Sequence, residues 1–452
     1  MALDALGPAG EYRTRKTELI LDTRGIPVAE LSMVPRLYVT RSVSAQRAVR
    51  PLPLAEREPA LARASELFLD SRIAGLDFAE YVTLTCRVTG LPMGVARAGG
   101  HAVATALDET FDAVRPAQPA GARLDWRDVD ARGGAVWARR GDVLAVLAPG
   151  NAPGVHGLWP QALALGYRVA VRPSRREPFT AHRLVIALRQ AGFRDEDVLF
   201  LPTEHSVADE FVRAADLAMV YGGHDVTAPY ASDPAVLVNG PGRTKIVITA
   251  DCDWRDHLDV IVESIAGLGG MACVNTTAVL CEGDPEPLAR AIAERLSATV
   301  ALPNVDEAAT LPTMPLAEAR ALAEYLGLRS RGTEAILGAD QVVADLGDGY
   351  AALRPAVHLL RRPDVEVINV ELPFPCVWVS GWSRADCPGP LRNSLVVNAI
   401  TTDDDLIDDL LADPTVTNVF SGRHPTQYTS PRIPHEGYLA DFLMRNKGFI
   451  RS

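Results

Sequence analysis

Short apolar segments that alternate with helix-like stretches constrain the fold of this chain more than any other feature. Between residues 140 and 225, apolar segments lie at 143–147, 168–171, 198–201 and 217–221. Amphipathic stretches at 154–165, 180–190 and 207–214 separate them. Strands that are apolar on both faces and joined by helices are typical of a parallel sheet with helices on either side. The sequence therefore predicts an α/β protein.

The same alternation returns in the second half of the chain. We expect strands at 245–249 and 277–281, helices near 257–266 and 287–296, and further strands at 365–369 and 376–380. No low-complexity linker separates the two halves, and the best candidate for a boundary is the turn Asn239-Gly240-Pro241-Gly242. A chain of 452 residues is also expected to form more than one domain.

Composition excludes several classes of protein. The net charge of −12 argues against general nucleic-acid binding, which requires a basic face. The six cysteines are scattered without a Cys-x-x-Cys pair, so neither a disulfide framework nor a metal site is expected. The chain shows neither a signal-like start nor an apolar run of about 20 residues. We expect a soluble protein of the reducing cytoplasm, with no membrane partner.

One cysteine lies in a turn of small residues, Gly269-Gly270-Met271-Ala272-Cys273-Val274-Asn275, directly before an apolar segment. A thiol that attacks a carbonyl carbon needs a tight turn through which the substrate approaches, and nearby N–H donors that favour the thiolate. The alternative is a buried small hydrophobic residue, the usual role of a free cysteine. Cys273 is therefore a candidate nucleophile.

Polar or glycine-rich groups follow three of the predicted strands, at the sheet edge where open parallel sheets bind ligands. Asn151 follows the first strand, Arg172-Pro173-Ser174-Arg175-Arg176 the second, and Gly222-Gly223-His224 the fourth. The glycines allow backbone N–H groups to approach a phosphate. Each group also has a plainer interpretation, because Asn151 suits an ordinary turn and the arginines suit a solvated face.

Taken in chain order, these groups resemble the motifs of the aldehyde dehydrogenase superfamily. The matching segments are Pro149-Gly150-Asn151, Arg172-Pro173-Ser174-Arg175, Gly222-Gly223, Asn239-Gly240-Pro241-Gly242-Arg243, Gly270-Met271-Ala272-Cys273 and Glu371-Leu372-Pro373-Phe374-Pro375. The C-terminal segment 433–439 is similar to the acyl-thioester reductases related to the fatty acid reductase of bacterial bioluminescence. Residues 1–110 carry little that matches.

The resemblance implies a fold and a set of site residues. It implies a Rossmann-type nucleotide-binding domain over 1–242, a catalytic thiol domain over 243–400, and a segment 401–452 that completes the nucleotide-binding and oligomerisation regions. Cys273 would be the nucleophile, and Asn151 would stabilise the oxyanion together with the Cys273 N–H. The cofactor contacts would come from Arg172, Ser174, Arg175, Gly222, Gly223, Glu371 and Phe374.

One departure from the family pattern bears on the reaction. Hydrolytic members use a glutamate as general base where this chain has Asn239, and an amide takes no proton at neutral pH. An acyl group on Cys273 would then transfer to a thiol in preference to water. The resemblance therefore implies NAD(P)H-dependent reduction of an acyl thioester, carried by coenzyme A or a carrier protein, to an aldehyde.

Two alternatives remain open. The first is an NAD(P)-dependent aldehyde dehydrogenase that forms a carboxylate, which a carboxylate within reach of Cys273 would favour. The second is a non-catalytic homologue that acts as a binding partner in a biosynthetic complex. His224 and His435 are possible proton donors, but a lone histidine is more often structural, so neither is placed in the catalytic set.

The cofactor and the assembly can also be predicted. The family pattern has a lysine and a glutamate facing the adenosine ribose, where this chain has Arg172 and Arg175. Because arginines bind a 2′-phosphate and a carboxylate repels it, we expect NADPH to be preferred over NADH. A strand or hairpin over 122–140, with a turn at Arg132-Gly133-Gly134, would combine with the C-terminal tail and present an edge for a second subunit, so a homodimer or larger homo-oligomer is expected.

Overall fold

The apolar segments of the first half form one seven-stranded sheet in the computed structural model, which describes residues 1–451. The sheet order is β12-β11-β8-β9-β10-β2-β3. Its parallel strands are β8 (Val143–Leu147), β9 (Arg168–Arg172), β10 (Val198–Phe200), β11 (Leu217–Tyr221) and β12 (Val236–Asn239). The antiparallel strands β2 (Ala5–Gly7) and β3 (Gly10–Tyr12) extend it at one edge. The predicted α/β fold is confirmed.

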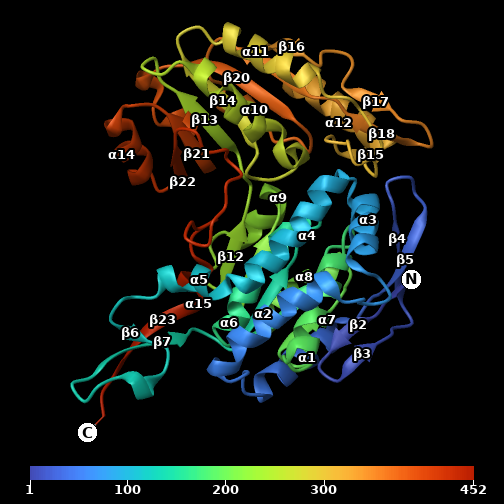
Figure 1. The fold of residues 1–452 in the computed structure, drawn as a ribbon, viewed down its shortest axis with the longest axis vertical. Helices are drawn as coiled ribbons and strands as arrows, with labels where there is room; N and C mark the ends of the chain where they lie inside the picture. Colours follow the sequence, from blue (N-terminus) through green and yellow to red (C-terminus); the bar gives the residue numbers. More distant parts are fainter. Residues whose placement is uncertain (452) are drawn as a thin grey trace.

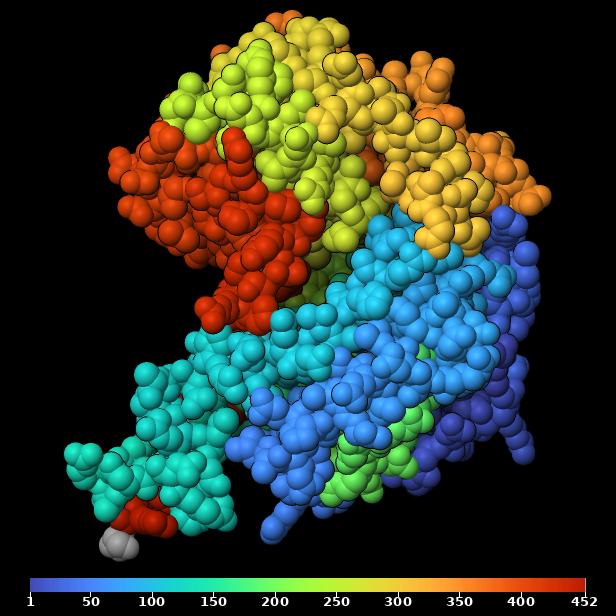
Figure 2. Space-filling model, in the orientation of Figure 1, coloured from blue at the N-terminus to red at the C-terminus, as the bar shows by residue number. Residues whose placement is uncertain are grey.

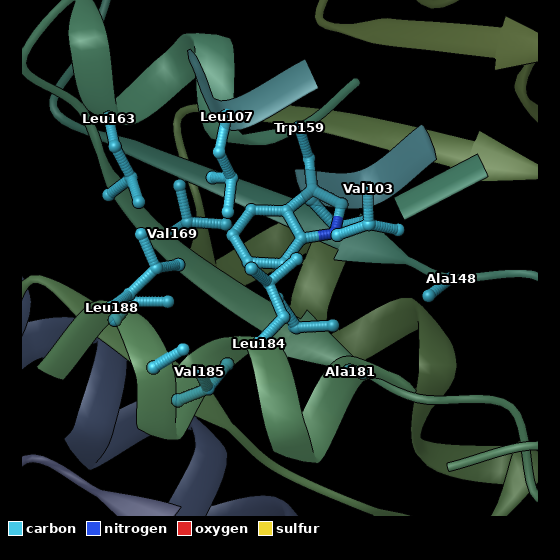
Figure 3. Close-up of a cluster of buried hydrophobic side chains, with 14 of the residues drawn as sticks. Val103, Leu107, Ala148, Trp159, Leu163, Val169, Ala181, Leu184, Val185 and Leu188 are labelled. Atoms are coloured by element: carbon cyan, nitrogen blue, oxygen red, sulfur yellow. The ribbon is translucent and has the colours of Figure 1, made fainter. Parts of the chain in front are cut away.

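Helices cover both faces of this sheet because its strands are apolar on both faces. Leu144 and Val146 of β8 pack in a core with α2 (Leu54–Asp70), α3 (Phe78–Thr89), α4 (Met93–Asp108), α6 (Pro160–Ala164) and α7 (Phe179–Ala191). Val143 and Ala145 face the opposite way, toward α1 (Arg36–Ala48) and α8 (Ala208–Ala214). Figure 3 shows Trp159 at the centre of the first core, between side chains of α4, β9 and α7.

A second seven-stranded sheet forms the upper lobe of Figure 1, in the order β16-β19-β20-β14-β13-β21-β22. Its strands are β13 (Thr244–Ile248), β14 (Thr276–Glu282), β16 (Glu334–Leu337), β19 (Ala356–Leu360), β20 (Cys376–Trp382), β21 (Ser394–Ile400) and β22 (Val416–Ser421). All of them run parallel except β16.

Alternate residues of these strands again point into two cores. Ile246 and Val279 pack with α10 (Leu258–Ala266) and α11 (Glu286–Ser297). Val247 and Leu280 pack with α12 (Leu316–Arg329) and α14 (Asp404–Ala412). Three short antiparallel strands, β15 (Thr313–Pro315), β17 (Val343–Asp345) and β18 (Tyr350–Leu353), flank this lobe. Because β22 belongs to its sheet, this lobe extends past residue 400, the predicted end of the catalytic domain.

The remaining elements lie at the periphery of the lower lobe. At the N-terminus, β1 (Ala2–Leu3), β4 (Thr17–Leu21) and β5 (Pro27–Ser32) form a small sheet. The short helices α5 (Thr110–Val114), α9 (His224–Thr227) and α15 (Leu439–Leu443) also belong to the lower lobe, whereas the short helix α13, described below, packs in the upper lobe. After β22 the chain runs down beside β12 to α15, shown in red in Figure 1.

The segment 122–140 combines with the C-terminal tail as expected, but the hairpin predicted within it is wrong. The strand β7 (Gly134–Arg139) pairs along its whole length with the C-terminal strand β23 (Met444–Phe449), antiparallel. The preceding strand β6 covers only Ala122–Arg123 and runs parallel to β7. A hairpin needs antiparallel neighbours, and Asp125 instead caps a helical turn at Trp126–Asp128. The ribbon therefore joins two segments that are distant in sequence, and the homo-oligomer stays a prediction.

Two predicted elements differ from those observed. Residues 365–369, expected as a strand, contain the short helix α13 (Val365–Ile368), because the Asp364 side chain accepts hydrogen bonds from the N–H groups of Glu366 and Val367. The helix expected at 154–165 is interrupted: a 3-10 turn covers Pro153–Gly157, and α6 begins at Pro160. Along residues 1–451, none of the helices combines the length and apolarity that a membrane crossing requires.

Candidate active site

Cys273 lies in a strained turn that leads into the central strand β14. Before it, the 3-10 segment Gly267–Gly270 holds Leu268 at φ 55° and Gly269 at φ 72°, a region that costs most residues energy. At Gly270 a Cβ atom would lie 2.4 Å from the Pro375 nitrogen, so only glycine fits. The Asn275 side chain accepts from the Ala272 N–H (2.9 Å) and donates to the Gly267 carbonyl (2.7 Å). These contacts fix the cysteine's backbone.

The start of β13 packs directly against the same cysteine. A Cβ atom on Gly242 would lie 1.9 Å from the Cys273 carbonyl oxygen, so the two backbones approach as only glycine allows. The Thr244 hydroxyl donates to this oxygen at 2.9 Å. Nearby, Lys245 is fully buried and donates to the Arg243 carbonyl (2.9 Å) and the Ser394 hydroxyl (2.7 Å). Burial lowers the pKa of Lys245 to about 7.

A histidine and a glutamate from the C-terminal segment face the cysteine. The Cys273 Sγ lies 3.9 Å from Nε2 of His435, and Nδ1 of the same ring lies 3.2 Å from Oε2 of Glu436. The other Glu436 oxygen accepts from the Gly240 N–H at 2.6 Å. Burial opposes protonation of the ring, but hydrogen bonds and charges from Cys273 and Glu436 outweigh it and raise the pKa of His435 to about 10.

Two further polar groups near this cluster have no hydrogen-bond partner within residues 1–451. They are the Tyr221 hydroxyl and the Asn239 amide, which leaves both its oxygen and its nitrogen unpaired. The two residues are register partners at the ends of β11 and β12. Burial, together with the negative charge of Glu436 and Cys273, raises the pKa of Tyr221. Buried polar atoms without partners are costly, which is typical of a site that awaits a ligand or water.

The predicted phosphate and oxyanion groups lie at the carboxyl ends of the lower sheet. Asn151 follows β8, and its buried Oδ1 has no partner in the described chain. A Cβ atom on Gly150 would lie 2.3 Å from the Ser174 hydroxyl, which places these two strand ends side by side. Gly222 and Gly223 lead from β11 into α9, and space is open beside Gly223.

Both predicted arginines already have protein partners. Arg172 is 8% exposed and donates to the Thr203 hydroxyl at 3.0 Å. Arg175 is exposed, and its guanidinium lies 3.0 Å from both carboxylate oxygens of Glu18 on β4. Glu18 therefore places a negative charge next to Arg175, although the motif Arg172-Pro173-Ser174-Arg175 contains no carboxylate of its own.

The two predicted residues from the segment 371–375 occupy different environments. Glu371 is exposed, and its Oε1 accepts from the Arg243 N–H at 2.9 Å, so it lies next to the Gly242–Thr244 stretch that contacts Cys273. Phe374 is 1% exposed and packs in the core with Trp378 and Ile368. Its ring therefore supports the segment from inside the upper lobe.

The structure thus brings together Cys273 from the upper lobe, Tyr221 and Asn239 from the lower lobe, and His435 and Glu436 from the C-terminal segment. Figure 2 shows this red C-terminal segment on the surface between the two lobes. From the sequence, His435 is a possible proton donor but stays outside the catalytic set as a lone histidine, and Glu436 was missed. They lie 162 and 163 residues from the cysteine in sequence, so no local pattern links them to it. The signal available was the adjacent His-Glu pair inside the segment 433–439, which already showed a resemblance. Across residues 1–451 no cluster of His, Cys, Asp and Glu suits a metal ion.

A cysteine in a glycine-rich turn, between two α/β lobes and close to the strand ends of a parallel sheet, is the arrangement expected of an enzyme that works by covalent catalysis. The model of the aldehyde dehydrogenase family matches residues 36–385, so the chain belongs to this family. The predicted superfamily is confirmed, whereas the acyl-thioester reductase branch stays a prediction.

Curated relatives match only part of the chain. "Malonate-semialdehyde dehydrogenase 1" of Geobacillus kaustophilus is 24% identical over 162 residues, covering 34% of this chain and 33% of its own. A Caenorhabditis elegans protein named "Probable methylmalonate-semialdehyde/malonate-semialdehyde dehydrogenase (acylating), mitochondrial" is 29% identical over 148 residues, covering 30% of this chain and 28% of its own. The matches therefore span about a third of the length of these relatives.

Solved structures confirm the fold over the whole chain. An NAD-dependent aldehyde dehydrogenase from Sinorhizobium meliloti superposes with a TM-score of 0.83 at 17% identity, covering 99% of this chain and 94% of its own. A 3,6-anhydro-L-galactose dehydrogenase in complex with NAP gives 0.82 at 16% identity, covering 99% of both chains. The predicted aldehyde dehydrogenase-like fold is thus confirmed.

Proposed function

We propose that this protein oxidises an aldehyde to a carboxylate through a covalent intermediate on Cys273, with a nicotinamide nucleotide as cofactor. The observation that carries the proposal is the placement of Cys273. Its turn precedes β14 and packs against Gly242, just past the carboxyl end of β12 in the lower sheet, and Nε2 of His435 lies 3.9 Å from the sulfur. The names of the relatives, semialdehyde dehydrogenases, support oxidation of an aldehyde.

The residues at the strand ends fit a nicotinamide nucleotide. The open space beside Gly223 and the unpaired, buried Oδ1 of Asn151 leave room and polar atoms for a ligand at this edge. The residues that would hold the nucleotide are Arg172, Ser174, Arg175, Gly222, Gly223 and Glu371, with Phe374 supporting the segment of Glu371 from the core. When bound, the nucleotide supplies the hydride acceptor for the oxidation, or the hydride donor in the reverse direction.

The chain's own residues account for the covalent steps. His435 accepts the thiol proton, and the Cys273 thiolate attacks the aldehyde carbon to give a tetrahedral oxyanion. The Asn151 side-chain N–H and the Cys273 backbone N–H stabilise this oxyanion; loss of such a donor typically costs about 2.7–4 kcal/mol. After oxidation, the acyl group remains on Cys273 as a thioester, which water cleaves to the carboxylate.

A second function is the reduction of an acyl thioester, from coenzyme A or a carrier protein, to an aldehyde. Asn239 favours it, because the amide at this position takes no proton from water and leaves the acyl-enzyme free to exchange with a thiol. The word "acylating" in the name of the Caenorhabditis elegans relative also favours a thiol acceptor. Both functions share the Cys273 acyl-enzyme.

For the cofactor we propose a preference for the 2′-phosphorylated nucleotide, NADPH or NADP+, with NADH possible. Arg175 is exposed and, within residues 1–451, pairs only with the half-exposed carboxylate of Glu18, which a phosphate can displace.

One assay separates these functions. Semialdehydes and simple aldehydes are incubated with NAD+ or NADP+, with and without coenzyme A, and the nucleotide absorbance and the products are followed. Carboxylate without added thiol supports the first function. Product only with coenzyme A, or nucleotide oxidation with acyl-CoA, supports the second. No turnover with any substrate would contradict both.

A further inference from the structure

We propose that His435 and Glu436 complete a catalytic triad with Cys273, in which His435 is the general base that activates water against the acyl-enzyme. This inference deepens the proposed oxidation and rests on its Cys273 acyl-enzyme. Asn239 cannot act as a general base. In this inference the base comes from the C-terminal segment, which follows the last strand of the upper sheet.

The two ring nitrogens of His435 face different partners. Nδ1 faces Glu436 at 3.2 Å, and Nε2 faces the Cys273 sulfur at 3.9 Å. A carboxylate that accepts from Nδ1–H holds the ring in the tautomer whose Nε2 carries the free electron pair. Glu436 is itself anchored, because its second oxygen accepts from the Gly240 N–H at 2.6 Å. The order carboxylate, imidazole, thiol is that of a nucleophile with an oriented base.

The segment that carries the pair is held in place at its backbone. Asn418 of β22, 9% exposed, donates from its side-chain nitrogen to the carbonyl oxygens of both His435 and Leu395. The Tyr438 hydroxyl donates to the Arg432 carbonyl and closes the turn around the pair. The approach of His435 to Cys273 is therefore built by contacts to the upper lobe, and does not depend on one flexible side chain.

The charge on His435 changes with the state of Cys273. The titratable groups that face the ring are Cys273 and Glu436, and the Tyr221 hydroxyl lies within range of both. While the sulfur is anionic, the imidazolium stabilises it, in accord with a pKa of His435 raised to about 10. Acylation removes the negative sulfur, so the pKa of His435 falls. The ring then releases to solvent the proton that it took from the Cys273 thiol, and Nε2 becomes able to take a proton from water.

The hydrolytic step then balances without any further reactant. His435 Nε2 takes one proton from a water molecule, and the hydroxide oxygen bonds to the thioester carbon. The carbon–sulfur bond breaks, the electron pair returns to Cys273 as thiolate, and the carboxylic acid leaves and ionises. The proton that His435 gained remains on the ring, opposite the thiolate, which restores the starting ion pair. The acyl carbon is neither oxidised nor reduced in this step.

The first test is the rate at which iodoacetamide alkylates Cys273, which needs neither substrate nor nucleotide. The imidazolium lies 3.9 Å from the sulfur and stabilises the thiolate. At the dielectric constant of water this attraction changes the alkylation rate by about 5-fold, and in a protein interior it changes the rate by far more. We therefore expect His435→Asn to slow alkylation about 10- to 100-fold at pH 6.5. The difference should shrink toward pH 10, where His435 loses its charge.

The second test is the lifetime of the acyl-enzyme. p-Nitrophenyl acetate acetylates Cys273 at pH 9.5, the enzyme is moved to pH 7.5, and intact mass spectrometry follows loss of the acetyl group. His435→Asn should lengthen the lifetime about 100-fold or more, the typical contribution of a general base. Glu436→Gln, which keeps its size and an acceptor for the Gly240 N–H, should lengthen it less. His424→Asn, at an exposed position earlier in the same segment, is the matched control and should behave as wild type.

The outcomes separate this inference from the proposed function. Equal acyl-enzyme lifetimes in wild type and in both the His435 and Glu436 variants overturn the triad, whatever the oxidation assay shows. A triad that passes both tests in a protein that oxidises no aldehyde overturns the proposed function alone. A His435→Asn protein that fails to fold leaves Glu436→Gln to decide, since circular dichroism shows whether each variant is intact.

Discussion

Changing the charge at Glu18 and at Arg175 should move the cofactor preference in opposite directions. The Arg175 guanidinium lies 3.0 Å from both oxygens of Glu18, with side chains 45% and 35% exposed. A pair this exposed is worth about 0.2–1 kcal/mol, whereas a charge-assisted hydrogen bond to phosphate is worth about 1.5–3 kcal/mol. A 2′-phosphate that takes Arg175 from Glu18 therefore gains about 0.5–3 kcal/mol.

These energies translate into a ratio of kcat/KM for NADP+ over NAD+. Glu18→Gln frees the arginine and should raise the ratio by about 1.4- to 5-fold, and Arg175→Met should lower it by about 2- to 100-fold. Steady-state kinetics with each nucleotide measure both changes. Arg176→Met is the matched control, because its guanidinium donates to the Thr89 carbonyl at 3.3 Å. A ratio that neither variant changes would refute the assignment of Arg175 to the 2′-phosphate.

Three further outcomes are expected. Cys273→Ala should abolish oxidation and thioester reduction but leave nucleotide binding, measured by fluorescence titration, unchanged; residual turnover near wild type would exclude the covalent mechanism. Asn239→Glu adds a carboxylate where the amide has no hydrogen-bond partner within residues 1–451, so it should speed release of the carboxylate product relative to transfer to a thiol. Asn239→Gln should leave the ratio of the two products unchanged. Equal product ratios for the Glu and Gln variants would contradict this expectation. Trp159 is 1% exposed, so Trp159→Ala leaves a cavity in the core and should lower the free energy of unfolding, measured by urea denaturation, by about 3–5 kcal/mol. Trp159→Phe should lower it less. A small decrease for Trp159→Ala would mean that the surrounding side chains collapse into the cavity.

The sequence determined the features that depend on neighbouring residues. The strands at 143–147, 168–172 and 217–221 were found to within one residue because a run of apolar side chains between helical stretches has few other solutions. The turn at Cys273 was also visible, since a series of glycines before a strand signals a tight backbone wherever it lies. The order of the motifs was enough to indicate the family.

Tertiary structure decided every contact between distant segments. The pairing of β7 with β23, the ion pair of Arg175 with Glu18 and the approach of His435 to Cys273 join residues that are more than 150 positions apart. No local periodicity encodes such contacts, because they depend on how two lobes and a returning C-terminal segment pack together. The sequence thus pointed to Cys273 as a candidate nucleophile. Only the fold brought close to it a histidine that, judged alone, had the pattern of an ordinary structural residue.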